Sequence, residues 1–167
     1  MKKIFLSKAF GLIVVCFSLS SVATTLITKE RICPLGGERF TVEALGSYST
    51  FGKRLDFKTL GTYGTDPFRL EVCPNGFVDY KENYSKAELN KLEDLITSDN
   101  YQTLRLDNTD YFLLAKISEY MGADKLRIGG LYLKASWEAE NEGNRTQYVQ
   151  YLNLAIDNFN AVVDTGD

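Results

Sequence analysis

Two short Cys-Pro turns constrain this chain more than any other feature of its sequence. Cys33 begins the stretch CPLGG and Cys73 begins the stretch CPNGF, and in both a glycine follows three positions after the cysteine. A zinc knuckle reads Cys-Pro-x-Cys-Gly, so each stretch keeps the frame of a knuckle but lacks its second cysteine. Structural zinc almost always has four protein ligands. Two half knuckles therefore leave two thiols whose chemistry depends on the compartment of the protein.

The N-terminal segment predicts export. Lys2 and Lys3 precede a mostly apolar run at residues 9–19, and Ser21-Val22-Ala23 is a small-x-small cleavage site. This order is typical of a secretory signal peptide, and the run is shorter than the ~20 residues that span a bilayer. We predict that residues 1–23 are a cleaved signal peptide and that the mature protein is periplasmic or secreted. A retained anchor is the alternative.

Charge and composition exclude several function classes. Removal of Lys2, Lys3 and Lys8 lowers the basic residues from 19 to 16 against 22 acidic ones, a net charge of −6. Because an acidic chain without a dense Lys/Arg run binds phosphates poorly, neither nucleic acid nor an anionic membrane is an expected partner. The chain has no His, which excludes Ser-His-Asp triads, Cys-His pairs and His-ligated metals. Catalysis by paired carboxylates stays open, but no pair of acids stands out.

Cys33 and Cys73 are the only cysteines of the mature chain, because Cys16 lies in the signal segment. Two cysteines in an exported protein most often form one disulfide, and we predict that bond here. Zinc is an alternative that would need further ligands from acids or from a second chain. A redox-active pair is another, although such pairs usually have Cys-x-x-Cys spacing. We expect no metal, no other cofactor and no catalytic residue.

Residues 24–84 predict a small antiparallel β head. Apolar and polar residues alternate over residues 39–44, 55–59 and 68–72. Period-two alternation between Gly, Pro and Asn turn signals is typical of half-buried strands. A disulfide would reinforce a head whose core is this thin.

Residues 85–167 predict an antiparallel α-helical tail, so the expected fold class is α+β. Ser85 and Glu88 form a capping box at the start of a first helix, which we expect to end near Thr97. A second helix is expected to start after Asn108 or Thr109 and to end at Gly122 as its C-cap. A third is expected to start with Asp124 as its N-cap, and a fourth to start at Asn144 or Thr146.

Two patterns in the tail indicate how its helices pack. Gly129 and Gly130 lie inside the third predicted helix, which favours a close approach by a neighbouring helix over a hinge. The last predicted helix carries a continuous apolar stripe, typical of a packing face, made of Tyr148, Leu152, Ala155, Phe159 and Val162.

The tail resembles the second half of a tetratricopeptide repeat, through ASWEAE and the spacing of Ala155, Phe159 and Val162. The whole arrangement resembles the bacterial family catalogued as domain of unknown function 2225, in which two Cys-Pro-x-Cys-Gly knuckles precede tetratricopeptide-like helices. The resemblance covers about residues 29–163 and rests on CPLGGERF, DPFRLEVCPNGF and the helical tail.

The resemblance implies a degenerate zinc-ribbon-like head. Cys33 and Cys73 match the first cysteine of each knuckle, and Gly36 stands where the second cysteine of the first knuckle should be. The two remaining sulfurs would have shared one metal, so a disulfide between them would replace the metal in the same frame. The family itself has no established activity, so the resemblance implies a fold and not a reaction.

These observations favour an exported, non-catalytic protein-interaction module that binds a protein or peptide in the cell envelope. A redox- or metal-responsive sensor built on Cys33 and Cys73 is one alternative, and a carbohydrate-active enzyme with two carboxylates is another. An exposed apolar groove along the helices would favour the module, and an exposed, strained disulfide would favour the sensor. A cleft lined by paired acids would favour the enzyme.

Overall fold

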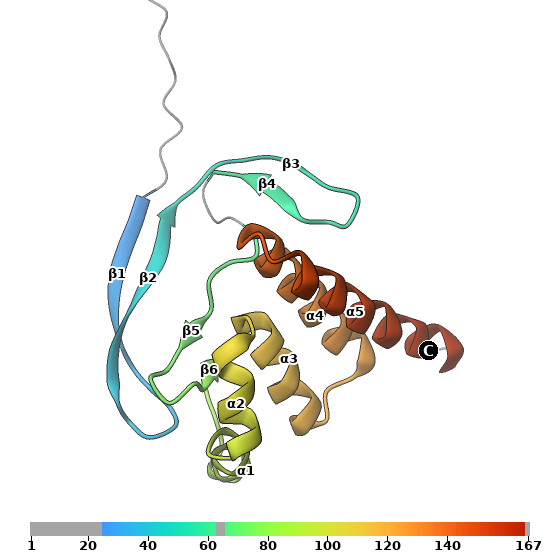
Figure 1. Ribbon diagram of the computed structural model, residues 1–167. Helices are drawn as coiled ribbons and strands as arrows, with labels where there is room; N and C mark the ends of the chain where they lie inside the picture. Colours follow the sequence, from blue (N-terminus) through green and yellow to red (C-terminus); the bar gives the residue numbers. More distant parts are fainter. Residues whose placement is uncertain (1–24, 63–65, 166–167) are drawn as a thin grey trace, which may run out of the picture.

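The computed structural model describes residues 25–62 and 66–165, so the predicted signal peptide at residues 1–23 lies outside the described residues. Within them, three two-stranded antiparallel sheets precede five helices (Figure 1), and the predicted α+β class is confirmed. The strands are β1 (Thr25–Ile32), β2 (Arg39–Ser47), β3 (Thr50–Lys53), β4 (Thr59–Gly61), β5 (Glu71–Val72) and β6 (Val78–Asp79). The helices are α1 (Lys86–Ile96), α2 (Asp99–Asp107), α3 (Asp110–Met121), α4 (Lys125–Asn141) and α5 (Arg145–Thr165).

The first hairpin, β1–β2, is long and partly unsupported. The predicted alternation holds in β2, where Phe40, Val42 and Ala44 are half-buried and the residues between them are exposed. Every residue of β1 is exposed. Arg31 of β1 donates to both carboxylate oxygens of Glu71 at 2.7 and 2.8 Å, which ties the hairpin to β5.

The alternation predicted around residues 55–59 is wrong as a strand. Residues 54–58 form the tip of the β3–β4 hairpin, and only Thr59 of the pattern belongs to a strand. Leu55 and Phe57 in the tip are 102% and 74% exposed. Polar contacts of the tip explain its shape, because Arg54 and Lys58 both bind Glu140 of α4. The alternation at residues 68–72 also predicts a longer strand than the structure has, since only Glu71–Val72 pair with β6.

Cys33 and Cys73, the predicted pair, are joined by a disulfide with an S–S distance of 2.11 Å. Both residues are buried, at 1% and 2% exposure, and they share one hydrophobic core with residues of α1 to α5. Each cysteine begins a tight turn, in which Gly37 N–H donates to the Cys33 carbonyl and Gly76 N–H donates to the Cys73 carbonyl. Gly76 has φ of 89°, a conformation that favours glycine.

Helix α2 holds the second Cys-Pro turn in place, and the sequence analysis missed it. Tyr101, fully buried, donates its hydroxyl to the carbonyl of Gly76 at 2.9 Å. Gln102 and Arg105 donate to the neighbouring carbonyls of Asn75 and Pro74. These three donors satisfy backbone acceptors that the turn itself leaves unpaired, which is a requirement for burying it.

The remaining helix boundaries agree with the predicted signals. Ser85 and Glu88 form the capping box of α1, Gly122 ends α3 in the left-handed conformation, and Asp124 caps α4 by accepting from Arg127 N–H. Helices α4 and α5 pack as an antiparallel pair (Figure 1). The buried face of α5 differs from the predicted stripe, because Tyr151 and Asn158 are buried while Leu152, Phe159 and Val162 are only half-buried.

A first prediction concerns the covalent link. Because both thiols are consumed in the bond, a thiol count on the denatured, non-reduced mature protein should find no free thiol, and elemental analysis should find no zinc. Reduction should lower the free energy of unfolding by roughly 4 kcal/mol, since the bond closes a loop of 40 positions. Two free thiols, or stoichiometric zinc, would restore the metal-site interpretation.

A second prediction uses the neighbouring glycines of α4 as a matched pair. A Cβ on Gly129 would lie 2.6 Å from Cε1 of Phe159, whereas a Cβ on Gly130 meets nothing within 4 Å. Gly129→Ala should therefore destabilise the fold by ~1–3 kcal/mol through forced displacement of the ring. Gly130→Ala should stabilise it by up to ~1 kcal/mol through helix propensity. Equal denaturation midpoints for the two variants would show that α4 and α5 do not approach closely here.

Candidate functional site

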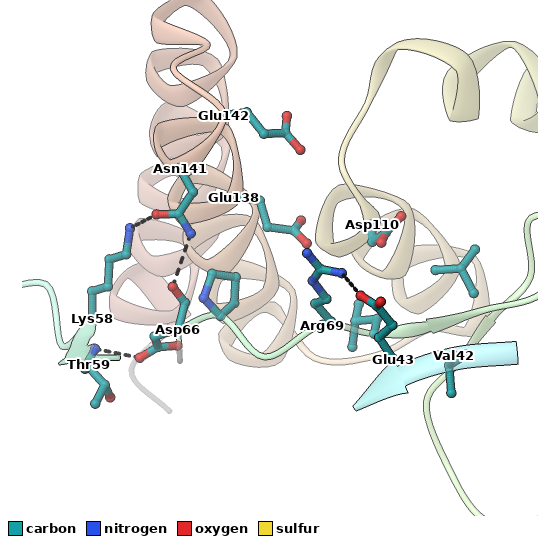
Figure 2. A pocket seen from close by; sticks show the side chains of 14 residues that line it. Val42, Glu43, Lys58, Thr59, Asp66, Arg69, Asp110, Glu138, Asn141 and Glu142 are labelled. Atoms are coloured by element: carbon teal, nitrogen blue, oxygen red, sulfur yellow. Dashed lines mark hydrogen bonds and ion pairs between the residues drawn. The ribbon is translucent and has the colours of Figure 1, made fainter. Parts of the chain in front are cut away.

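A cleft of about 780 Å³ lies between the β strands and two helix ends. One wall is β2 together with residues 66–72, and the other is the start of α3 and the end of α4 (Figure 2). The lining side chains that carry charge are Glu43, Lys58, Asp66, Arg69, Asp110, Glu138 and Glu142.

The cleft has a surplus of carboxyl groups, and its two basic side chains are already engaged. Lys58 is 7% exposed and donates to Glu140 at 2.9 Å and to Asn141 at 2.7 Å. Arg69 pairs with Glu43 at 3.1 Å, with both side chains more than half exposed. Five acids therefore face two cations, and the cleft favours a positively charged ligand.

The β3–β4 hairpin forms one side of this cleft, and polar contacts with the end of α4 hold the hairpin in place. Besides the contacts of Arg54 and Lys58, Asp56 accepts a hydrogen bond from the indole N–H of Trp137 at 3.0 Å. Asp66 accepts from Thr59 N–H at 2.6 Å, which holds the following segment against β4. The lining residues of this wall are thus positioned by contacts between parts of the chain about 80 residues apart.

Glu138 is the most perturbed carboxyl group in the cleft. Its Oε2 accepts from the backbone N–H of Tyr111 at 2.8 Å, in the first turn of α3, where the N-cap Thr109 makes no side-chain cap bond. Burial raises the pKa of Glu138 to about 8, although the hydrogen bond from Tyr111 opposes this. The negative charges of Asp110 and Glu142 raise it further. Glu138 therefore caps α3 from another helix and holds a proton near neutral pH.

Asp110, the first residue of α3, is the second perturbed carboxyl group. Burial raises its pKa, the charge of Glu142 adds to that rise, and Arg69 opposes it. Carboxyl groups with raised pKa values in a cleft are candidates for acid–base chemistry. However, no aromatic side chain lines the described part of the cleft, so it lacks the stacking platform that sugar-binding sites commonly use.

A smaller apolar notch of about 170 Å³ lies beside the cleft along β2. The rings of Tyr48 and Phe68 meet edge to face across it, with centroids 5.3 Å apart. The notch shares Glu43, Arg69 and Leu70 with the cleft, so the two hollows are neighbours. Leu26, Ala44, Leu45 and Glu71 complete its lining.

The residues singled out in the sequence lie elsewhere. Cys33 and Cys73 line neither the cleft nor the notch, and their burial does not match the exposed disulfide expected of a redox sensor. Sequence reasoning missed Asp110 and Glu138, because nothing in the local pattern distinguishes them from the other 20 acids of the chain. Only the packing of α4 against the start of α3 brings them together.

Within residues 25–62 and 66–165, no group of three or more Cys, Asp and Glu residues has an arrangement that would hold a metal ion. No helix in the same residues combines the length and hydrophobicity needed to cross a bilayer.

Comparison of the chain with protein-family models, with curated proteins and with solved structures gave no match. The resemblance to the knuckle-containing bacterial family, and the likeness of the tail to a tetratricopeptide unit, stay predictions. The site is therefore interpreted from its own geometry and chemistry.

A third prediction concerns the proton on Glu138. Its pKa is about 8 in the folded protein against an ordinary value of 4.5, so between these values the folded state keeps a proton that the unfolded chain releases. The free energy of unfolding should therefore fall as pH rises through this window. Glu138→Gln keeps an acceptor for Tyr111 N–H without a charge. The free energy of unfolding of this variant should not fall through the window, and above pH 8 the variant should be more stable than the wild type.

Denaturant titrations at several pH values would test this, with Glu82→Gln as the control because Glu82 is exposed and outside the cleft. The control should follow the wild-type profile. Parallel profiles for the wild type and Glu138→Gln would show that Glu138 is ionised in the folded protein at neutral pH.

Proposed function

We propose that this protein is an exported, non-catalytic interaction module that receives a segment of a partner polypeptide in the cleft. The observation that carries the proposal is the cleft itself, which is open and about 780 Å³ in volume. Two engaged cations and five acids line it, and four acids remain in excess of the cations where Glu138 is protonated. The apolar notch beside it offers a place for an uncharged side chain. A polar cleft next to an apolar pocket suits a peptide better than a small uniform ligand.

The export part of the proposal is supported by the signal-like sequence at residues 1–23 and by the Cys33–Cys73 bond. Disulfides persist in oxidising compartments and are rare in the cytosol. The partner is accordingly a protein or peptide of the cell envelope or its surroundings. The proposed binding site is a cleft between strands and helix ends, not the apolar groove along the helices that would have favoured the module by itself.

A carboxylate-based enzyme is the second candidate, and one observation favours it. A carboxyl group with a pKa of about 8, next to a second perturbed acid, has the properties of a general acid. The capping bond from Tyr111 to Glu138 and the lack of aromatic rings among the described lining residues support the binding role instead. The two candidates differ in one respect: Glu138→Gln abolishes acid catalysis but leaves polypeptide binding in place.

The fourth prediction tests the binding role with two charge variants of the mature protein. Peptides selected from a displayed random library against the wild type should be rich in Lys and Arg. Their affinity should fall about tenfold or more with Glu142→Lys, a loss of roughly 1.4 kcal/mol, because Glu142 lines the cleft. The carboxylate of Glu142 makes no hydrogen bond within the described residues, so the change should not disturb the fold.

Glu82→Lys is the matched control, since it changes the net charge equally on an exposed residue outside the cleft. It should alter the affinity by much less than Glu142→Lys. A library that yields no binders, or binders that both variants weaken equally, would overturn the proposal that the cleft binds a polypeptide.

A further inference from the structure

Strand β2 has a free edge, and both hollows follow it. Among the described strands, β2 pairs only with β1. Val42 and Glu43 line the cleft, and Glu43, Ala44 and Leu45 line the notch. Because successive strand residues point to opposite faces, the cleft, which is lined by the consecutive residues Val42 and Glu43, reaches the edge of β2. The notch also includes Leu26 of β1, so it extends from this edge over one face of the hairpin.

The facing wall is the extended segment of residues 66–72, which runs past both hollows. Asp66, Pro67, Arg69, Leu70 and Val72 line the cleft, and residues 68–71 line the notch. No backbone ladder joins this segment to β2 in the described residues, since β5 pairs with β6 alone.

Among the described residues, a side-chain ion pair connects β2 with this segment at the hollows. Arg69 binds Glu43, and their side chains are 58% and 56% exposed. An exposed ion pair of this kind contributes little, about 0–1 kcal/mol. A cationic group of a partner can therefore compete with Arg69 for the Glu43 carboxylate.

We propose that the partner segment binds as an added β-strand on the free edge of β2, with a Lys or Arg side chain toward the carboxyl groups of the cleft and an apolar side chain in the notch. This inference rests on the proposed function and names the form of the partner. Strand addition satisfies the backbone groups of the edge, and the pockets beside it select alternate side chains. The surplus of acids sets the charge of the occupant.

The edge lacks two of the usual protections against pairing, a Pro and an inward-pointing charge. Natural edge strands are commonly blocked by Pro, by inward-pointing charges or by a covering element. Residues 39–47 of β2 contain no Pro, and their half-buried face carries Phe40, Val42 and Ala44. The β1–β2 hairpin would gain a third strand, which two-stranded hairpins need for independent stability.

The test uses a capped peptide of alternating Lys and Val, of about seven residues, a typical strand length. Two isomers of this peptide carry N-methyl groups on alternate backbone amides: one isomer on the odd-numbered amides and the other on the even-numbered amides. Their charge and side chains are identical. In an added strand, alternate N–H groups face the neighbouring strand. One isomer should bind the mature protein like the unmethylated peptide, and the other about tenfold or more weakly, because several backbone hydrogen bonds are lost together.

The outcomes separate this inference from the proposed function. If the unmethylated peptide binds and both isomers bind equally well, the cleft recognises side chains without strand addition, and only the inference fails. If the unmethylated peptide does not bind and the displayed library yields no binders, the proposed function fails as well. Sedimentation of the protein alone provides a third outcome: a dimer that the peptide dissociates would make a second copy the occupant and overturn the inference.

Discussion

The disulfide between Cys33 and Cys73 is the constraint on which the β head depends. It joins two turns 40 positions apart, and Asn75 adds a second bridge by donating to the carbonyl of Leu35 at 2.8 Å. Around this junction the backbone has few ladder bonds, because β5 and β6 contribute only two residues each. Buried turns need partners for their carbonyl groups, and α2 supplies them. A covalent link thus fixes the separation of the turns, while a helix from the other half of the chain satisfies their polar groups.

The candidate site depends on this junction through the segment that leads to Cys73. Residues 66–72 form one wall of the cleft and end at the disulfide. At the other end, the β3–β4 hairpin that precedes the segment is positioned by contacts with α4, which Arg54, Asp56 and Lys58 make. The wall is therefore held at both ends, and its middle contacts β2 through the pair of Arg69 and Glu43. This arrangement leaves a strand edge beside an acidic cleft. Burial raises the pKa of Glu138 to about 8, so that part of this acidity is protonated near neutral pH, and burial also raises the pKa of Asp110.

The sequence predicted the elements that depend on local signals. The capping box at Ser85, the left-handed end of α3 at Gly122 and the cap at Asp124 are each decided within one helical turn, and all three are present. The missed helix α2 shows the limit of such signals. The first helix was expected to end near Thr97 and the next to start after Asn108 or Thr109, whereas Ser98 caps a helix between them by accepting from Tyr101 N–H. Serine followed by Asp and Asn is equally typical of a turn and of a helix start, and only the contacts of Tyr101, Gln102 and Arg105 with the Cys-Pro turn distinguish the two.

By itself, the sequence determined the α+β class, the pairing of the two cysteines, most helix boundaries and the exclusion of His-dependent chemistry. These follow from residue identity, short-range periodicity and the small number of cysteines. The tertiary structure alone decided the site. Leu55 and Phe57 alternate like strand residues but are exposed, because ion pairs with α4 hold their loop, and Glu138 becomes distinctive only when α4 packs against the start of α3. The physical reason is that burial and charge proximity depend on contacts between distant segments, which no local pattern in the chain records.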